Sequence, residues 1–137
     1  MIAIILTEWL EFAVRWFHII TAIAWIGSSF YFIALDLGLK KNKSLPDGVI
    51  GEEWQVHGGG FYNIQKYSIA PPNLPKDLIW FKWESYSTWL SGFFLLVIVY
   101  YGGADIYLID REIADINSYE AILISLVSIL LGWVIYN

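Results

Sequence analysis

The sequence contains no cysteine. Disulfides, thiolate metal sites, iron–sulfur clusters and covalent attachment of a c-type haem are therefore excluded within this chain, and any redox group must be held by His, Met or Tyr. Charge is scarce as well, because only 15% of the 137 residues are charged and the acidic ones outnumber the basic ones by 13 to 8. With a net charge of −5 there is no basic face to neutralise phosphates, so nucleic acid is excluded as a partner.

Hydrophobic residues are abundant instead. They make up 58% of the chain, and the mean hydropathy of +0.56 exceeds that of a soluble domain of this size. We therefore predict an all-α integral membrane protein whose single membrane domain covers residues 1–137. The predicted transmembrane helices are three, at residues 10–36, 84–104 and 120–137, with connections at 37–83 and 105–119. The third segment is short for a span, which predicts that the chain is a fragment of a longer protein.

The first predicted span contains Trp16 to Leu35, twenty consecutive residues in which the only ionisable group is His18. As a helix this run is about 30 Å long, the thickness of the hydrocarbon core of a bilayer. Helical periodicity places one polar stripe along it, with Glu8 close beside the stripe. The stripe residues are Glu11, Arg15, His18, Ala22, Trp25, Ser29 and Asp36. Because unpaired polar groups are costly at membrane depth, this stripe is expected to face other helices, a cofactor or water.

His18 is the strongest candidate for chemistry in this helix. A neutral imidazole in a span can ligate haem iron or another metal, relay protons, or form a structural hydrogen bond to a neighbouring helix. Trp25 and the small residues after it leave room for a flat macrocycle, which favours haem, and equally allow close helix packing. Arg15 can pair with Glu11 one turn away, or its planar donor fork can bind a haem propionate or an anionic substrate. The predicted cofactor is therefore haem, with His18, Arg15 and Trp25 as its contacts.

The connection 37–83 has a different pattern. The segments EEWQVH and FYNIQKYSIA, separated by three glycines, predict a short β-hairpin before the helix-breaking run APPNLP. His57, Gly58, Gly59 and Gly60 resemble the oxyanion loop of lipases, but the chain has no G-x-S-x-G motif to supply a nucleophile, so that interpretation is rejected. The glycines permit positive φ and close approach of the backbone to a ligand. His57 is therefore either a pocket residue or part of a plain hairpin turn.

Donors, aromatics and one carboxylate follow around the prolines, among them Lys66, Trp83 and Glu84. They are either membrane-surface anchors or a site that stacks and charge-pairs a polar aromatic anion. The connection 37–83 carries six lysines, whereas the connection 105–119 carries only Arg111. This asymmetry predicts that the first connection is cytoplasmic and the N-terminus lies outside.

Three runs of the sequence resemble the N-terminal membrane region of the bacterial membrane-bound urate oxidase (urate hydroxylase) family. They are WFHIITAIAWIGSSFYFIALD (16–36), GEEWQVHGGGFYNIQKYSIAPPNLP (51–75) and WFKWESYSTWLSGFFLLVIVYY (80–101). The resemblance implies a multi-helix domain in the bacterial inner membrane, followed by a cytochrome c domain whose haem lies outside this chain. It further implies oxidation of urate to 5-hydroxyisourate, with the electrons passed to that cytochrome.

The resemblance also supplies candidate residues. Those that match the family's motifs are His18, His57, Gly58, Gly59, Gly60, Lys66, Trp83 and Glu84. The candidates for catalysis among them are His57, Lys66 and Glu84. The candidates for substrate binding are His57, Gly58, Gly59, Gly60, Lys66 and Trp83. More weakly, the first helix resembles that of protoporphyrinogen oxidases that hold haem b, which implies His18 as an axial ligand of haem iron. Two other hypotheses stay open: a non-catalytic haem b electron-transfer subunit, and a structural or transport protein.

Overall fold

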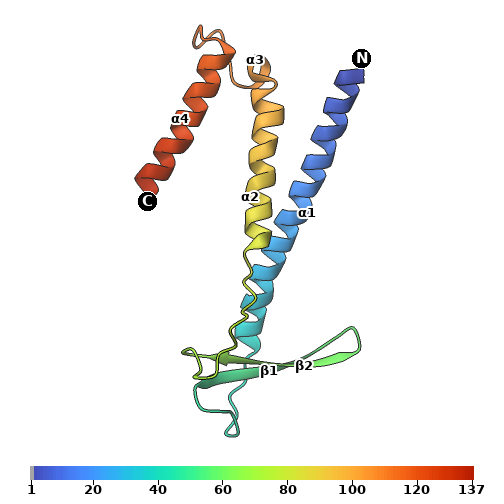
Figure 1. The fold of residues 1–137 in the computed structure, drawn as a ribbon, viewed down its shortest axis with the longest axis vertical. Helices are drawn as coiled ribbons and strands as arrows, with labels where there is room; N and C mark the ends of the chain where they lie inside the picture. Colours follow the sequence, from blue (N-terminus) through green and yellow to red (C-terminus); the bar gives the residue numbers. More distant parts are fainter. Residues whose placement is uncertain (1) are drawn as a thin grey trace. The chain divides into compact units, whose positions relative to one another are not determined.

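The computed structural model describes residues 2–137 as a mostly helical chain with one β-hairpin (Figure 1). The elements in chain order are α1 (Ile2–Gly38), β1 (Val49–His57), β2 (Gly60–Tyr67), α2 (Trp83–Leu95), the π-helical segment η1 (Leu96–Tyr101), α3 (Ala104–Tyr107) and α4 (Ser118–Tyr136). Two compact units are present. One joins α1 up to Ala22 with Glu84–Asn137, and the other is Ile23–Trp83. The predicted helical class and the predicted hairpin are both confirmed.

Two helices, Ile4–Gly38 and Ser118–Tyr136, are long and apolar enough to cross a membrane, by length and composition. They correspond to the first and third predicted spans, and α1 begins well before the predicted residue 10. The second predicted span, 84–104, is not one continuous α-helix, because α2 passes into the π-helical η1 at Leu96 and α3 follows as a separate turn. A three-span membrane fold therefore stays a prediction.

In the first unit, α1 and α2 pack through small and polar side chains. Thr21 of α1 and Thr88 and Ser91 of α2 are buried, the last at 2% exposure. Large apolar side chains point outward instead, with Trp16 61% and Trp89 67% exposed. Small residues let helix backbones approach closely, and this arrangement, polar between the helices and apolar outside, is typical of helices that associate in lipid.

The chain continues in the same unit through η1 and α3 to α4. The Tyr101 hydroxyl and the Ser125 hydroxyl are 3.0 Å apart, and Ser118 Oγ donates to Asp105 Oδ1 at 2.5 Å. Asn117 caps α4: its side chain accepts the backbone N–H groups of Tyr119 and Glu120, and the Glu120 side chain accepts the N–H of Asn117. This capping box satisfies donors that a helix start leaves unpaired, and it explains why α4 begins at Ser118.

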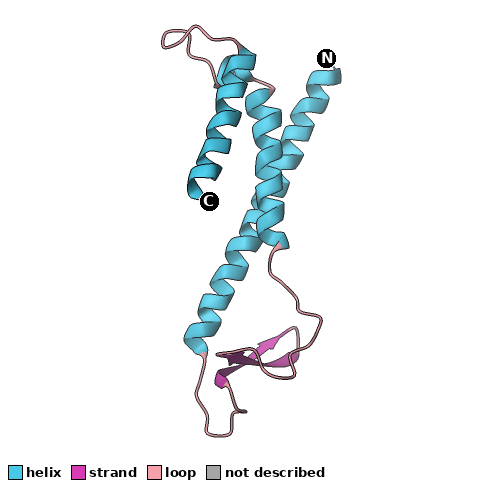
Figure 2. Cartoon of the chain, turned by 60° about the vertical axis from the view of Figure 1, so that its left-hand side comes forward, coloured by secondary structure: helices cyan, strands magenta, loops and turns pink. Residues whose placement is uncertain are grey.

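The second unit contains the hairpin and the remainder of α1 (Figure 2). Strands β1 and β2 are antiparallel, and His57 pairs with Gly60 across a two-residue turn. Gly58 and Gly59 have φ values of +57° and +80°, so the turn has the mirror-image geometry that matches strand twist and that favours glycine at both positions. Gly60, expected in the turn, begins β2 instead.

Strand alternation gives the hairpin two different faces. Glu53, Gln55 and His57 share one face with Tyr62 and Ile64 of β2, since directly paired residues point the same way. The C-terminal part of α1 lies against this face: Lys66 Nζ binds Asp36 Oδ1 at 2.6 Å, and the Glu53 carboxylate packs on Gly38. On the other face the apolar side chains of Trp54, Val56 and Phe61 are exposed.

Candidate functional site

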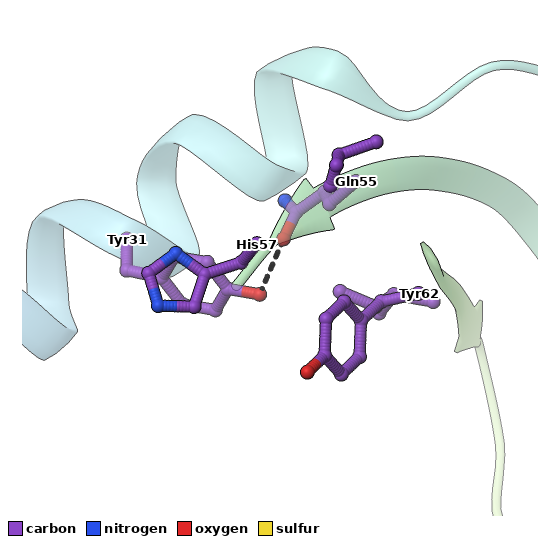
Figure 3. A pocket seen from close by; sticks show the side chains of 6 residues that line it. Tyr31, Gln55, His57 and Tyr62 are labelled. Atoms are coloured by element: carbon purple, nitrogen blue, oxygen red, sulfur yellow. Dashed lines mark hydrogen bonds between the residues drawn. The ribbon is translucent and has the colours of Figure 1, made fainter. Parts of the chain in front are cut away.

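The pocket between α1 and the hairpin is the candidate site. It has a volume of about 680 Å³, within the range of small-molecule sites. Its lining residues are Tyr31, Gln55, Val56, His57, Tyr62 and Ile64. All six belong to the second unit: Tyr31 comes from α1, three of them from β1, and Tyr62 and Ile64 from β2. Three aromatic or heteroaromatic rings and one amide therefore surround a single space (Figure 3).

A chain of hydrogen bonds fixes the amide of Gln55. The Tyr31 hydroxyl donates to Gln55 Oε1 at 2.8 Å (Figure 3), and Gln55 Nε2 donates to Glu53 Oε1 at 3.2 Å. The two bonds define which end of the amide is the acceptor and which is the donor. One lone pair on Oε1 and one hydrogen on Nε2 are left for a further partner. Gln55 can therefore present an acceptor and a donor side by side.

Gly60 affects the position of the Tyr62 ring at the edge of the pocket. A Cβ at Gly60 would lie 3.3 Å from ring atoms of Tyr62, so the bare backbone leaves room for that ring to lie back over β2. Gln55 and Tyr62 are directly paired across the strands. His57, two residues after Gln55 on the same face, stands next to the turn and is exposed. The imidazole is thus accessible beside a tyrosine ring and a fixed amide.

The arrangement is suited to a planar heterocycle that carries N–H and C=O groups on its edge. Aromatic rings stack on such a ligand, and an amide that offers one donor and one acceptor pairs with a matching edge. The accessible imidazole can donate to an anionic edge or accept a proton from one.

Only part of the predicted substrate site gathers here. His57 lines the pocket, and Gly60 leaves room for the ring of Tyr62, which also lines it. Gly58 and Gly59 form the turn. Lys66 lies six residues along β2 from Gly60, which separates it from His57 by about 20 Å along the hairpin. Its ammonium group is engaged with Asp36. The structure therefore places His57 and Lys66 at opposite ends of the ladder.

Trp83 and Glu84 stand at the start of α2, in different units. The Trp83 indole is 66% exposed and the Lys82 ammonium lies 5.8 Å from its ring centre, an arrangement typical of a surface anchor. One carboxylate oxygen of Glu84, Oε2, is buried and has no hydrogen-bond partner among the residues that the structure describes. Their predicted roles in substrate binding and catalysis stay predictions.

His18 takes part in the contact between α1 and α2. Its Nδ1 lies 2.9 Å from Ser91 Oγ, and its backbone carbonyl accepts the Thr21 hydroxyl at 3.0 Å. The ring rests on Gly92, where a Cβ would come within 3.1 Å of Cε1. Within the described residues 2–137, no group of three or more His, Asp or Glu side chains could hold a metal ion. A metal bound at His18 would need a ligand such as haem to supply the other donors.

The other two predicted haem contacts have local partners. Arg15 forms the predicted ion pair within α1, at 3.3 Å from Glu11 Oε2, and its side chain is 55% exposed. Trp25 belongs to the second unit, where its carbonyl accepts the hydroxyls of Ser28 and Ser29. Its side chain helps to line a shallow pocket of about 290 Å³. Contact of Arg15 or Trp25 with haem stays a prediction.

Sequence reasoning missed Tyr31, Gln55, Tyr62 and Ser91. Gln55 and Tyr62 could have been found, because alternation places Gln55 on the face of His57 and a two-residue turn pairs it with Tyr62. Ser91 could have been found from the spacing of Ser87 and Ser91, since small residues four apart mark a helix contact. Tyr31 carried no local signal.

Comparison with known proteins agrees with the resemblance seen in the sequence. A family model described as "Urate oxidase N-terminal" matches residues 4–137. No curated protein and no solved structure matches the chain. The family match covers nearly the whole chain, including both apolar helices and every residue of the pocket. The chain therefore belongs to the urate oxidase N-terminal family, and its function is related to urate oxidation.

Proposed function

We propose that this chain is part of a membrane-bound enzyme that oxidises urate to 5-hydroxyisourate and passes the electrons to a cytochrome c. The family match supports urate as the substrate. Two helices of membrane-spanning length and outward-facing apolar side chains support a location in a membrane, and the resemblance implies that this is the bacterial inner membrane. The absence of cysteine means that a covalently attached cytochrome haem lies outside residues 1–137.

The pocket at Tyr31, Gln55, His57 and Tyr62 is the proposed urate site. Urate is a planar, anionic purine whose edge alternates N–H and C=O groups. The donor and acceptor that Gln55 keeps free match that alternation, and the tyrosine rings offer stacking surfaces. The fixed orientation of the Gln55 amide is the observation that carries this assignment, because a preorganised amide distinguishes urate from an arbitrary flat anion.

The reaction removes two electrons from urate and adds the oxygen of one water. In balanced form, urate and water give 5-hydroxyisourate, two protons and two electrons. His57 is the proposed proton acceptor, since its imidazole is accessible at the pocket. Gln55 and the tyrosines hold the substrate, and the electrons pass to the cytochrome.

Haem held by His18 between α1 and α2 is the proposed internal electron carrier. The contact of His18 Nδ1 with Ser91 supports this proposal, because it leaves Nε2 as the ring nitrogen that would bind the iron. When bound, haem supplies one-electron transfer. Arg15 remains the proposed partner of a propionate and Trp25 a proposed ring contact. The contact between His18 and Ser91 also favours a second candidate function, that of a subunit that relays electrons through haem without oxidising urate itself.

Urate-dependent reduction of cytochrome c by membranes that contain the full-length protein tests the proposal. Gln55→Leu removes the amide from the pocket, whereas Gln65→Leu makes the same change on the opposite face of the hairpin. We expect Gln55→Leu to raise the KM for urate by about tenfold, equivalent to about 1.4 kcal/mol, and Gln65→Leu to leave it unchanged. No urate turnover by the wild type would favour the relay subunit. Equal effects of the two variants would remove the pocket from the proposal.

The proposed orientation places the connection 37–83 in the cytoplasm and the N-terminus outside, because lysines concentrate in that connection. The lack of cysteine makes labelling direct. We expect a cysteine introduced for Lys43 in intact cells to be protected from a membrane-impermeant maleimide, and one introduced for Glu112 to react. The reverse pattern would contradict the orientation and leave the pocket assignment untouched.

A further inference from the structure

The Ser91 hydroxyl lies within hydrogen-bond distance of three groups, but it can donate a hydrogen bond to only one of them. Ser91 Oγ lies 2.6 Å from the carbonyl oxygen of Ser87, 3.0 Å from that of Thr88 and 2.9 Å from His18 Nδ1. The hydroxyl has a single hydrogen. Where that hydrogen points decides which nitrogen of His18 carries a proton.

The shortest of the three distances settles the assignment. Two oxygens 2.6 Å apart are in contact only when a hydrogen lies between them, and a serine within a helix ordinarily donates to the carbonyl four residues earlier. If the hydrogen pointed at His18 instead, two carbonyl oxygens would crowd the serine oxygen with nothing to bind them. Ser91 therefore donates to its own helix and accepts a hydrogen bond from His18 Nδ1–H.

We infer that Ser91 is a positioning residue that holds His18 as its Nδ1–H tautomer and so presents the Nε2 lone pair as a ligand. Ser91 is 2% exposed, and water therefore does not compete for this bond. Gly92 contributes by admitting the ring, because a Cβ there would stand 3.1 Å from Cε1. A histidine that ligates a metal is normally oriented through its other ring nitrogen in this way. The inference that haem iron is what Nε2 takes rests on the proposed function, whereas the tautomer does not.

Nitrogen NMR of the full-length protein labelled with 15N-histidine reads the tautomer directly. The resonances that vanish in His18→Gln are those of His18. In the wild type without haem, we expect Nδ1 to show the shift of a protonated ring nitrogen and Nε2 that of an unprotonated one. A protonated Nε2 in the wild type would overturn the inference.

Three variants on α2 separate positioning from packing. Ser91→Ala removes the acceptor and is expected to change the tautomer ratio by about 2- to 10-fold toward Nε2–H, the worth of one such hydrogen bond. Ser91→Thr keeps a hydroxyl and is expected to restore the wild-type ratio. Ser87→Ala keeps the backbone carbonyl that Ser91 uses and is expected to change nothing. A ratio in Ser91→Ala equal to that of the wild type would overturn the inference, even if the variant is less stable.

Haem titration provides the second readout. We expect haemin to produce a Soret band shift with the wild type and Ser91→Thr, with affinity about 10- to 100-fold weaker in Ser91→Ala, as for other residues that orient a metal ligand. His18→Gln is expected to abolish the shift. If the wild-type tautomer is as inferred and haemin does not bind, the haem proposal fails while the role of Ser91 stands. Equal haem affinity in Ser91→Ala and the wild type would show that Ser91 does not position the ligand.

Discussion

The hydrogen bond from Tyr31 to Gln55 gives the sharpest test of the pocket, because it involves one atom that can be removed. Tyr31→Phe deletes the hydroxyl and keeps the ring. The bond is 2.8 Å long and exposed, so its loss should weaken the orientation of the amide by about 0.5–1.5 kcal/mol. If Gln55 reads the edge of urate, kcat/KM should fall by about 2- to 12-fold.

A double-mutant cycle shows whether Tyr31 acts through Gln55. Gln55→Ala alone should lower kcat/KM further, because it removes the donor and the acceptor together. In that background Tyr31→Phe should have almost no effect, which gives a coupling energy of about 1 kcal/mol. The assay is the initial rate of urate-dependent cytochrome c reduction in membranes with matched protein amounts. Effects that multiply, with no coupling, would refute the argument that the tyrosine orients the amide.

Three further predictions concern elements inside one unit or the other, each measured as thermal unfolding in detergent. Gly58→Ala should lower the free energy of unfolding by about 1–2 kcal/mol, because φ is +57° at that position. Gly27→Ala should not lower it, because nothing lies within 4 Å of the new Cβ. Equal effects of the two variants would contradict the turn geometry. Asn117→Ala should lower the free energy of unfolding by about 1 kcal/mol, because α4 loses its N-terminal cap. An unchanged free energy of unfolding would mean that the capping box contributes nothing to stability. Lys66→Met should destabilise by less than about 1 kcal/mol, since both side chains of its pair with Asp36 are about half exposed, and the difference should vanish in high salt. A large loss of stability in Lys66→Met that does not depend on salt concentration would show that Lys66 has a role beyond its ion pair with Asp36.

Local rules predicted the features that depend on neighbouring residues in the sequence. The hairpin followed from alternation around the glycines, and the turn geometry followed from the need for positive φ at Gly58 and Gly59. The first and third helices followed from apolar runs free of proline, although α1 extends further toward the N-terminus than residue 10 because residues 2–9 contain no proline or glycine to end a helix.

Features that depend on contacts between distant segments were not predictable. The partnership of Tyr31 with Gln55 requires α1 to lie against one particular face of the hairpin, and no local pattern specifies that contact. Lys66 was grouped with His57 because both lie in one motif, but strand geometry separates them by about 20 Å. The π-helical segment at Leu96–Tyr101 had no signature either, since its residues are as compatible with an α-helix.

Binding of urate is the central claim, and calorimetric titration of the purified full-length protein in the absence of an electron acceptor measures it without any contribution from turnover. The account predicts that urate binds the wild type and Gln65→Leu equally, and that Gln55→Leu binds it about tenfold more weakly. Equal affinity for urate in the wild type and Gln55→Leu would contradict the account.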